Sequence, residues 1–581
     1  MAFGTLATLT AGCFFAWLLA APALAQEGKP QVAPEAASQV PAPPEAAEAS
    51  TSAPASAASP TVVMTSPRVA SFEVDWTAAR AALGPLDQLP PPAEAADANG
   101  ADALVRLNEA TAKILPEGAT SPVPVLLPFD MAAYVRDRAQ GTTADDGKYF
   151  FDFHVPTLFY PGPTGYDAAF SVRPQDMHGV DVVFARSADI QISASTIVYE
   201  LDGPLADPGA PVPSLEQDFP GIRRVILESR LRYIFTRFNI PYVVSIACND
   251  GPKSARQLAC READQIAVRF LKDLAVVGGV PNVVPVKTAA SPVEQPDAAA
   301  PDFTYNAPGD ILPGTGMKGQ GGRADTTVYA KIRFPMAHAP AYINSQSFMN
   351  WGNCDLTGRV ALGGHGRDQS YRCRVNDVPL YNDETRNYAY PWRDNFCEHR
   401  YWEVSQCPAG LGHQGEDIRP SACKLRNEDA DRCEPYQDDV VVVRDGMVLR
   451  HPGDEALYLI VDAPGERLRF RYLHMNPNMY DLAGLVSGRE LHEGDVLGPV
   501  GDYGRREGGT TYHLHLDLQV LTRQGWLYVN PYMTLVSAYE RLIGGRGRAV
   551  AGSASNSPPP GAIVGAGAGT EQAESKSAGK P

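Results

Sequence analysis

The chain has 581 residues, of which 44% are hydrophobic, and it carries a formal net charge of −17 at neutral pH. No cluster of basic residues interrupts this acidity, so the composition argues against a nucleic-acid partner, which would need a basic face. The acidity is more simply explained as keeping the protein soluble. Particular residues, rather than composition, must therefore indicate the function.

Residues 1–25 have the features of a signal peptide. They are nearly all apolar or small and end in Ala23-Leu24-Ala25, the small-x-small pattern at which signal peptidases cleave. Cleavage predicts an exported, periplasmic protein without a transmembrane helix. Because no Lys or Arg precedes Ala11, an uncleaved segment that anchors the protein in a membrane is the alternative. Residues 26–67, rich in Ala, Pro, Glu and Ser, predict a disordered tether, since they offer too little apolar surface to offset ordering entropy.

Residues 68–285 predict an α+β domain. Apolar residues at helical or alternating spacing predict helices at 101–115, 221–238 and 261–279, and strands at 188–201 and 241–248. The last of these helices is expected to end at Gly278-Gly279. No group of reactive side chains in this block indicates its role.

Residues 286–303 predict a disordered linker, and residues 304–543 a second domain. Short apolar runs separated by Gly, Pro and Asp predict strands in 437–450, 456–463, 467–475, 494–504 and 511–520. This pattern is typical of a mainly antiparallel β domain. Residues 544–581 are low in complexity and predict a disordered tail.

The cysteines agree with export. Apart from Cys13 in the signal segment, they form an even set, as expected for disulfides in an oxidising compartment. Short loops are the easiest to close, so we expect local pairing. The expected pairs are Cys248 with Cys260, Cys354 with Cys373, Cys397 with Cys407, and Cys423 with Cys433. No Cys-x-x-Cys spacing occurs, so zinc ligation by thiolates is not expected.

The stretch TYHLHLDLQV places His513, His515 and Asp517 at alternate positions of a predicted strand. Successive side chains of a strand point to opposite faces, so these polar groups share one face and the intervening leucines share the other. Such a histidine pair is not specific by itself, because structural imidazoles also occur on sheet surfaces. It gains meaning only in combination with other residues.

Two further sites precede this strand. His413 and Asp417 are four residues apart, but Gly415 and Pro420 make a helix improbable, so the pair must converge from a strand and its loop. His474 lies at the end of another predicted strand.

In this order, the residues resemble the lysostaphin-like zinc metallopeptidases, the LytM-domain family of peptidoglycan endopeptidases, over about residues 410–535. The family has a His-x-Gly-x-Asp-Ile pattern, a Tyr-x-His pattern, a glycine-rich run and a His-Leu-His pattern. The matching residues are His413, Gly415, Asp417 and Ile418; Tyr472 and His474; Gly494, Leu497, Gly498 and Gly501; and His513, Leu514 and His515.

The resemblance implies that His413, Asp417 and His515 bind one Zn²⁺ per chain, and that His474 and His513 are catalytic residues that do not bind the metal. Two imidazoles and one carboxylate leave a coordination position open, which is typical of a catalytic rather than a structural zinc site. The helical glutamate of other zinc proteases is absent, so these two histidines would perform the acid–base chemistry.

The chain also departs from the family. Insertions at about residues 340–410 and between Ile418 and Val440 flank the site, and Asp517 stands where the family usually has glutamate. That last change is expected to affect the surroundings of the metal ligands.

Two functions are consistent with these observations. The first is a zinc endopeptidase that hydrolyses peptide bonds in the stems or crosslinks of peptidoglycan. The alternative is a non-enzymatic LytM-like regulator that binds or activates another cell-wall hydrolase. The presence of all five histidine and aspartate positions favours the enzyme, since regulators of that kind usually lack one or more ligands.

Overall fold

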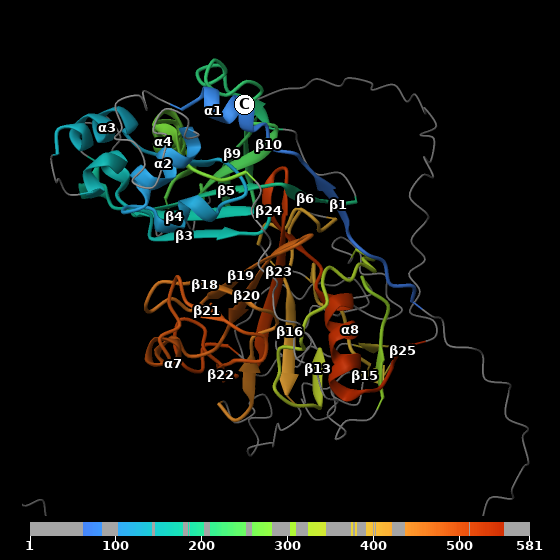
Figure 1. Cartoon of the computed structure of the whole chain (residues 1–581). Helices are drawn as coiled ribbons and strands as arrows, with labels where there is room; N and C mark the ends of the chain where they lie inside the picture. Colours follow the sequence, from blue (N-terminus) through green and yellow to red (C-terminus); the bar gives the residue numbers. More distant parts are fainter. Residues whose placement is uncertain are drawn as a thin grey trace, which may run out of the picture. The chain divides into compact units, whose positions relative to one another are not determined.

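The computed structural model of the protein describes residues 62–83, 103–141, 146–177, 184, 186–202, 209–250, 258–281, 302–309, 323–343, 374–375, 378–379, 391–398, 400, 402–408, 410–420, 436–510 and 512–550 (Figure 1). The signal segment, nearly all of both tethers and the tail beyond residue 550 lie outside these ranges. No helix in the described part of the chain is long and apolar enough to cross a membrane.

The first sheet has seven antiparallel strands in the order β3-β4-β5-β10-β9-β8-β7. Its strands are β3 Leu158–Gly162, β4 Gly165–Val172, β5 Ala188–Ser195, β7 Ala210–Pro211, β8 Arg223–Leu227, β9 Arg230–Arg237 and β10 Ile240–Ala247. Two further strand pairs form outside this sheet. These are β1 Arg68–Ser71 with β6 Ile197–Glu200, and β2 Val125–Pro128 with β11 Leu274–Gly278.

Helices cover one face of this sheet (Figure 1). They are α1 Trp76–Ala81, α2 Ala103–Thr111, α3 Met131–Ala139 and α4 Cys260–Lys272, with short 3₁₀ helices at 116–120, 146–153 and 174–176. The helix α4 is amphipathic and places Ala263, Ile266 and Phe270 in the core against β9 and β10. Helices and antiparallel strands thus occur together, as the sequence predicts for this region.

The predicted helix at 221–238 is wrong: this segment is the hairpin β8–β9, and Glu228 and Ser229 at its turn have positive φ. The apolar alternation was hidden because residues on both faces of β9 are buried or half-buried, with Arg232 at 1% exposure. The helix predicted at 261–279 is also too long. It ends at Lys272, and the chain continues as β11.

The second sheet has eight strands in the order β13-β16-β23-β20-β19-β18-β21, with β24 also pairing with β23. Its strands are β13 Ala341–Ile343, β16 Glu416–Pro420, β18 Gly446–Leu449, β19 Leu457–Ala463, β20 Glu466–Leu473, β21 Glu490–Leu491, β23 Leu514–Thr522 and β24 Gly525–Val529. All of these strands pair antiparallel, which confirms the sequence prediction for this region.

A core packs on one face of the second sheet. Leu514, Leu516 and Leu518 of β23 face this core, together with residues of the helix α8 Tyr532–Ile543, which ends at Gly544 in the left-handed conformation. The remaining elements are α7 Pro477–Leu482, β12 Phe303–Tyr305, β14 Arg374–Val375, β15 Val378–Pro379, β17 Asp439–Val441, β22 Val496–Pro499 and β25 Gly547–Ala549. Since β25 pairs with β12, regular structure begins within the predicted linker and extends into the predicted tail.

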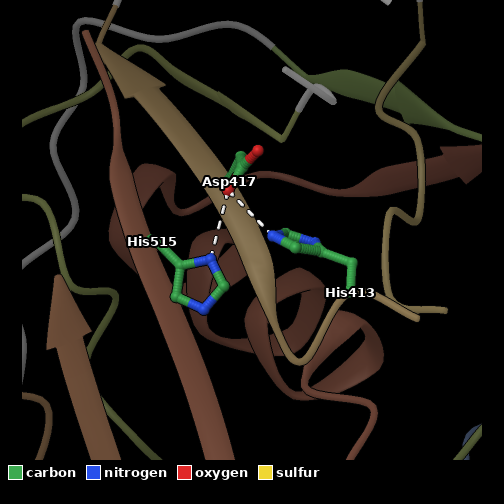
Figure 2. Close-up of side chains that lie close together, drawn as sticks. All are labelled: His413, Asp417 and His515. Atoms are coloured by element: carbon green, nitrogen blue, oxygen red, sulfur yellow. Dashed lines mark hydrogen bonds and ion pairs between the residues drawn. The ribbon is translucent and has the colours of Figure 1, made fainter. Parts of the chain in front are cut away.

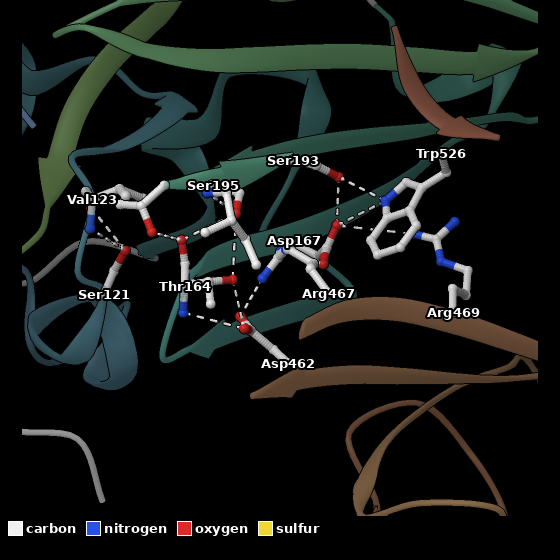
Figure 3. A network of polar contacts seen from close by, with 12 residues as sticks. Ser121, Val123, Thr164, Asp167, Ser193, Ser195, Asp462, Arg467, Arg469 and Trp526 are labelled. Carbon is white, nitrogen blue, oxygen red and sulfur yellow. Dashed lines mark hydrogen bonds and ion pairs between the residues drawn. The ribbon is translucent and has the colours of Figure 1, made fainter. Parts of the chain in front are cut away.

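The opposite face of the second sheet is also buried, because β4 and β5 of the first sheet pack against it. Arg467 of β20 pairs with Asp462 of β19 and, at 2.6 Å, with Asp167 of β4 (Figure 3). The hydroxyl and backbone N–H of Thr164 donate to Asp462 at 2.6 and 3.1 Å, and Trp526 of β24 donates to Asp167 at 3.4 Å. Polar groups therefore join the two sheets where sequence alternation alone would suggest a solvent-exposed face.

We expect Arg467→Met to lower the free energy of unfolding by about 3–5 kcal/mol, as measured by urea denaturation. The substitution keeps an apolar stem but leaves Asp462 buried without its cation, and Asp167 with Arg469 alone at 3.8 Å. Arg548→Met is the matched control. It removes an exposed ion pair with Asp302, so it should cost less than about 1 kcal/mol.

The loss should also depend on pH. Burial raises the pKa of Asp462 to about 6 even beside Arg467, and removal of Arg467 raises it further. A carboxyl whose pKa is raised by folding favours the folded state when protonated and loses that contribution as pH rises through its folded pKa. The destabilisation should therefore be larger at pH 8 than at pH 5. An equal loss at both values would show that Asp462 does not contribute.

Candidate metal centre and active site

Asp417 and His515 face each other on the neighbouring strands β16 and β23, whose antiparallel register pairs them directly. His413 lies in the loop just before β16, and its side chain reaches the same point (Figure 2). All three residues are no more than 2% exposed. One candidate ligand atom from each lies within 4.8 Å of the others. Folding thus brings together the three residues for which the family resemblance implies metal binding.

The carboxylate of Asp417 lies at the middle of the group. Its Oδ1 atom is 3.3 Å from Nε2 of His413 and 3.3 Å from Nδ1 of His515. Burial opposes the charged form of this carboxyl, but His513 and His413 hold its pKa well below the usual value. The group therefore contains one ionised carboxylate oxygen between two imidazole nitrogens, all three being candidate metal ligands.

The protonation of His413 favours a cation at this point. Its Nδ1 lies 3.1 Å from the carbonyl oxygen of Asn395, which can only accept, so Nδ1 carries the proton. Burial lowers the pKa of His413 to about 4, so the ring is neutral at pH 7 and Nε2 has a lone pair. That lone pair faces another acceptor, Oδ1 of Asp417. Two acceptors this close repel each other unless a positive charge lies between them, so the donor set fits a bound metal ion.

On the side of its ring away from Asp417, His515 lies next to a carboxylate that is itself paired with a guanidinium. Its Nε2 is 3.5 Å from Oδ2 of Asp517, and Asp517 in turn pairs with Arg471 of β20. A carboxylate next to the second nitrogen of an imidazole ligand fixes its tautomer and orientation. Asp517 therefore lies in the surroundings of the ligands, where we expected the departure from the family pattern to act.

His474 and His513 lie beside the three-residue group. His474 directly follows β20, and its ring centroid is 4.5 Å from that of His513 and 6.0 Å from that of His515. Its Nδ1 is 2.8 Å from the carbonyl oxygen of Tyr503, so this nitrogen carries the proton and Nε2 can accept one. Burial, together with the nearby imidazoles, holds the pKa of His474 well below its usual value. The φ of +73° at His474 is uncommon for a residue other than glycine and is typical of functional positions.

Two glycines of the motif allow these close approaches. A Cβ atom at Gly415 would lie 2.7 Å from Cβ of Asp517 and would overlap the carbonyl oxygen of Leu516, so only glycine lets the loop lie against β23. A Cβ atom at Gly501 would lie 2.6 Å from the carbonyl oxygen of His474. The glycine-rich run thus permits the contact that holds His474 in place.

Asn395 is a component that the sequence did not indicate. Besides accepting from His413 through its main chain, it accepts the backbone N–H of Asp417 at 3.0 Å through Oδ1, and it is fully buried. One residue thus positions two of the candidate ligands. It lies 18 residues before His413 within an insertion, and the only nearby signal was the cysteine at position 397.

We expect Asn395→Ala to weaken zinc binding by about 10- to 100-fold, the usual effect of removing a residue that orients metal ligands. The change removes the side-chain oxygen that accepts the backbone N–H of Asp417, so the carboxylate is held less firmly in position. Competition with a chromophoric chelator measures the affinity. Asn478→Ala, which alters an exposed asparagine on α7, is the control. An unchanged affinity in Asn395→Ala would rule out this positioning role.

Two of the expected disulfides are confirmed. Cys248 is bonded to Cys260 at the start of α4, and Cys397 is bonded to Cys407 in the segment that carries Asn395. The other two expected pairs, Cys354 with Cys373 and Cys423 with Cys433, lie outside the described residues.

Comparisons with known proteins give one similarity. No protein-family model and no curated protein matches the chain. Among solved structures, the chain matches the crystal structure of a protein described as a glycyl-glycine endopeptidase, LytM, from Ruminococcus gnavus, with 28% sequence identity over 24% of this chain and 50% of that one. The TM-score is 0.17, and the match spans half the length of that protein. The geometry described above, and not this similarity, is the basis for the function proposed below.

Proposed function

We propose that this protein is a zinc-dependent endopeptidase that hydrolyses peptide bonds in peptidoglycan stems or crosslinks. The observation that supports it most is the buried group of His413, Asp417 and His515, whose candidate ligand atoms lie within 4.8 Å of one another. Two further imidazoles lie beside this group. A structural zinc site would need a fourth protein ligand, whereas a catalytic site keeps one position open.

Under this proposal, Nε2 of His413, a carboxylate oxygen of Asp417 and Nδ1 of His515 hold the metal. When bound, zinc polarises a carbonyl oxygen and lowers the pKa of water to about 7. The protein contributes the orientation of these ligands through Asn395 and Asp517, and the burial that keeps bulk water out.

The proton transfers fall to His474 and His513. His474 is neutral, and its Nε2 can take a proton because Nδ1 donates to Tyr503. His513, 1% exposed, lies between His474 and Asp417, with its Nε2 3.3 Å from Oδ1 of Asp417. A proton taken from the nucleophile on one of these rings can be returned to the leaving amine, which is the general acid–base cycle of peptide hydrolysis.

Export to an oxidising compartment is part of the proposal. The two bonded cysteine pairs are consistent with such a compartment, where disulfides persist. N-terminal sequencing of the protein purified from whole cells, with their membranes, would test it: Gln26 as the first residue supports cleavage of residues 1–25, and Met1 supports the membrane anchor.

The decisive experiment combines elemental analysis of the purified protein with digestion of purified sacculi and chromatography of the released fragments. We expect about one zinc per chain and a fall in crosslinked fragments, abolished by a chelator and restored by zinc. If the protein contains zinc but cleaves nothing, the proposed endopeptidase function is contradicted and a role as regulator of another hydrolase is favoured. Absence of both would overturn the metal centre as well.

A further inference from the structure

A cavity of about 500 Å³ lies between the two sheets. Strands β5, β9 and β10 of the first sheet line one side, and β19, β20, β23 and β24 of the second sheet line the other. None of the five residues of the candidate active site lines it. Leu473, which directly precedes His474, does line it, so the cavity begins next to that site.

Two arginines that line the cavity have bonding capacity left. Arg230 of β9 is half-buried, donates only weakly to Ser245 at 3.3 Å, and makes no ion pair with any described residue. Arg469 of β20 is 5% exposed, donates to Gln191 at 3.3 Å, and has its nearest described carboxylate, Asp167, at 3.8 Å. Its Nε is buried without a hydrogen-bond partner in the described part of the chain.

Burial affects the pKa of both of these cations. Burial, with a smaller contribution from the charge of Arg230, lowers the pKa of Arg469 to about 10, although Asp167 opposes the shift. Burial likewise lowers the pKa of Arg230. Two guanidiniums that lose hydration while lining one cavity are unfavourable unless an anion pairs with them, and carboxylates are the anions that pair with arginine through two hydrogen bonds.

The other charged groups of the cavity are either satisfied or exposed. Glu228 and Arg232 pair with each other at 3.5 Å, and both also bind the backbone of β24 or its turn. Arg450 is occupied by Asp481 at 2.7 Å and by backbone carbonyls. Three acidic residues, Asp189, Asp454 and Glu455, also line the cavity; Asp189 and Asp454 are exposed and Glu455 is half-buried. The inner part therefore has an excess of available positive charge.

Aromatic residues complete the wall. Tyr458, Trp526 and Tyr528 line the cavity, and the guanidinium of Arg469 lies 4.3 Å from the centre of the Trp526 ring. Trp526 and Arg469 are shown at the sheet interface in Figure 3. Flat apolar surfaces beside a cationic pair suit a ligand that has an apolar stem and a carboxylate end.

The strand register links this cavity to the candidate metal centre. Arg469 is opposite Gln519, Arg471 is opposite Asp517, and Leu473 is opposite His515. Gln519, which lines the cavity, is four residues beyond His515 on the same face of β23, a separation of about 13 Å along a strand. That length corresponds to about four residues of extended peptide, so one chain could reach both places.

We propose that this cavity binds a side-chain or terminal carboxylate of a peptide, held by Arg230 and Arg469 against Tyr458, Trp526 and Tyr528. The inference rests on the proposed function only where it calls the ligand a substrate. In that case the cavity selects peptides that have a carboxylate a few residues from the bond that is cut at the metal centre.

Calorimetric titration of the full chain tests the site without hydrolysis. N-acetylglutamate carries two carboxylates, and N-acetylglutamine amide is its neutral counterpart of the same shape. We expect the acid to bind and the amide to bind at least tenfold more weakly, since charge-assisted hydrogen bonds are about twice as strong as neutral ones. Arg230→Gln should weaken binding of the acid by about tenfold and leave the amide unchanged. Arg230→Lys should lie between, because the charge stays but the two-bond geometry is lost.

Arg261→Gln is the matched control, since it removes an exposed arginine of α4 outside the cavity. Equal binding of acid and amide, or unchanged binding of the acid to Arg230→Gln, overturns the proposal. Displacement of the acid by inorganic phosphate at similar concentrations also overturns it, because the site would then bind any anion.

A hydrolysis assay separates this proposal from the proposed function. If sacculi are digested, Arg230→Gln should raise KM for acidic peptides with kcat nearly unchanged, because the cavity lies away from the reacting bond. If N-acetylglutamate binds but no form of the protein hydrolyses peptides, the carboxylate site is supported and the proposed endopeptidase function is contradicted. If peptides are hydrolysed equally well with and without a carboxylate, the endopeptidase function is supported and the carboxylate site is contradicted.

Discussion

A His413→Ala variant should purify folded, with its zinc content reduced from about one per chain to none and without activity on sacculi. The candidate ligands are one carboxylate oxygen of Asp417 and two imidazole nitrogens, each 3.3 Å from that oxygen. Loss of one imidazole therefore leaves only two ligands. A catalytic zinc site needs about three protein ligands to hold the ion against dilution and chelators. Asp417→Ala and His515→Ala should behave in the same way.

The fold should survive this change, because removal of His413 deletes no large apolar group. Its loop is also held by the Cys397–Cys407 disulfide and by the backbone hydrogen bonds of His413 to Cys397 and Glu398. Near-ultraviolet circular dichroism would verify the fold. His492→Ala, which changes an exposed histidine outside the cavity, is the control and should keep both zinc and activity. Retention of one equivalent of zinc by folded His413→Ala would exclude His413 as a ligand.

His474→Ala and His513→Ala should keep zinc and lose rate by about 10²- to 10⁴-fold, the usual contribution of a general acid or base. Their rings are 4.5 Å apart, beside rather than within the group that the resemblance implies to be ligands. The loss should appear in kcat with little change in KM, since these side chains are proposed to act on protons that move during the reaction.

His513 gives this prediction its sharpest test. Its Nε2 lies 3.3 Å from Oδ1 of Asp417, the same distance as the nitrogens of His413 and His515. Distance alone therefore does not separate a metal-binding role from a catalytic one. If His513→Ala loses zinc while His515→Ala keeps it, the two histidines have exchanged roles.

The sequence predicted the candidate site better than the fold that surrounds it. His413, Asp417, His474, His513 and His515 come together because strand pairing translates their alternation and spacing directly into proximity, as in the register of Asp417 with His515. Asn395 had no such pattern, since a residue that positions others through its backbone can be of many types and lie anywhere in the chain.

The hairpin β8–β9 was missed for a related reason. A strand with one solvated face shows period-two alternation, but β9 packs helices on one side and the second sheet on the other. Arg232, which would normally mark an exposed face, is buried there and Arg230 is half-buried, so the period disappears. The roles of Arg467, Arg469 and Arg471 could not be predicted for the same reason. These residues alternate along β20, as on a solvent-exposed face, but they contact the first sheet or the candidate site.

The candidate metal ligands and their supports come from three segments far apart in the chain, around residues 395–417, 471–503 and 513–517. An unfolded chain has no preformed arrangement of this kind, so an ion that binds the centre stabilises the folded state alone. At a free zinc concentration of about 100 times Kd, that linkage adds about 2.7 kcal/mol to the free energy of unfolding. The supply of metal would then govern how long the protein persists, as well as whether it reacts.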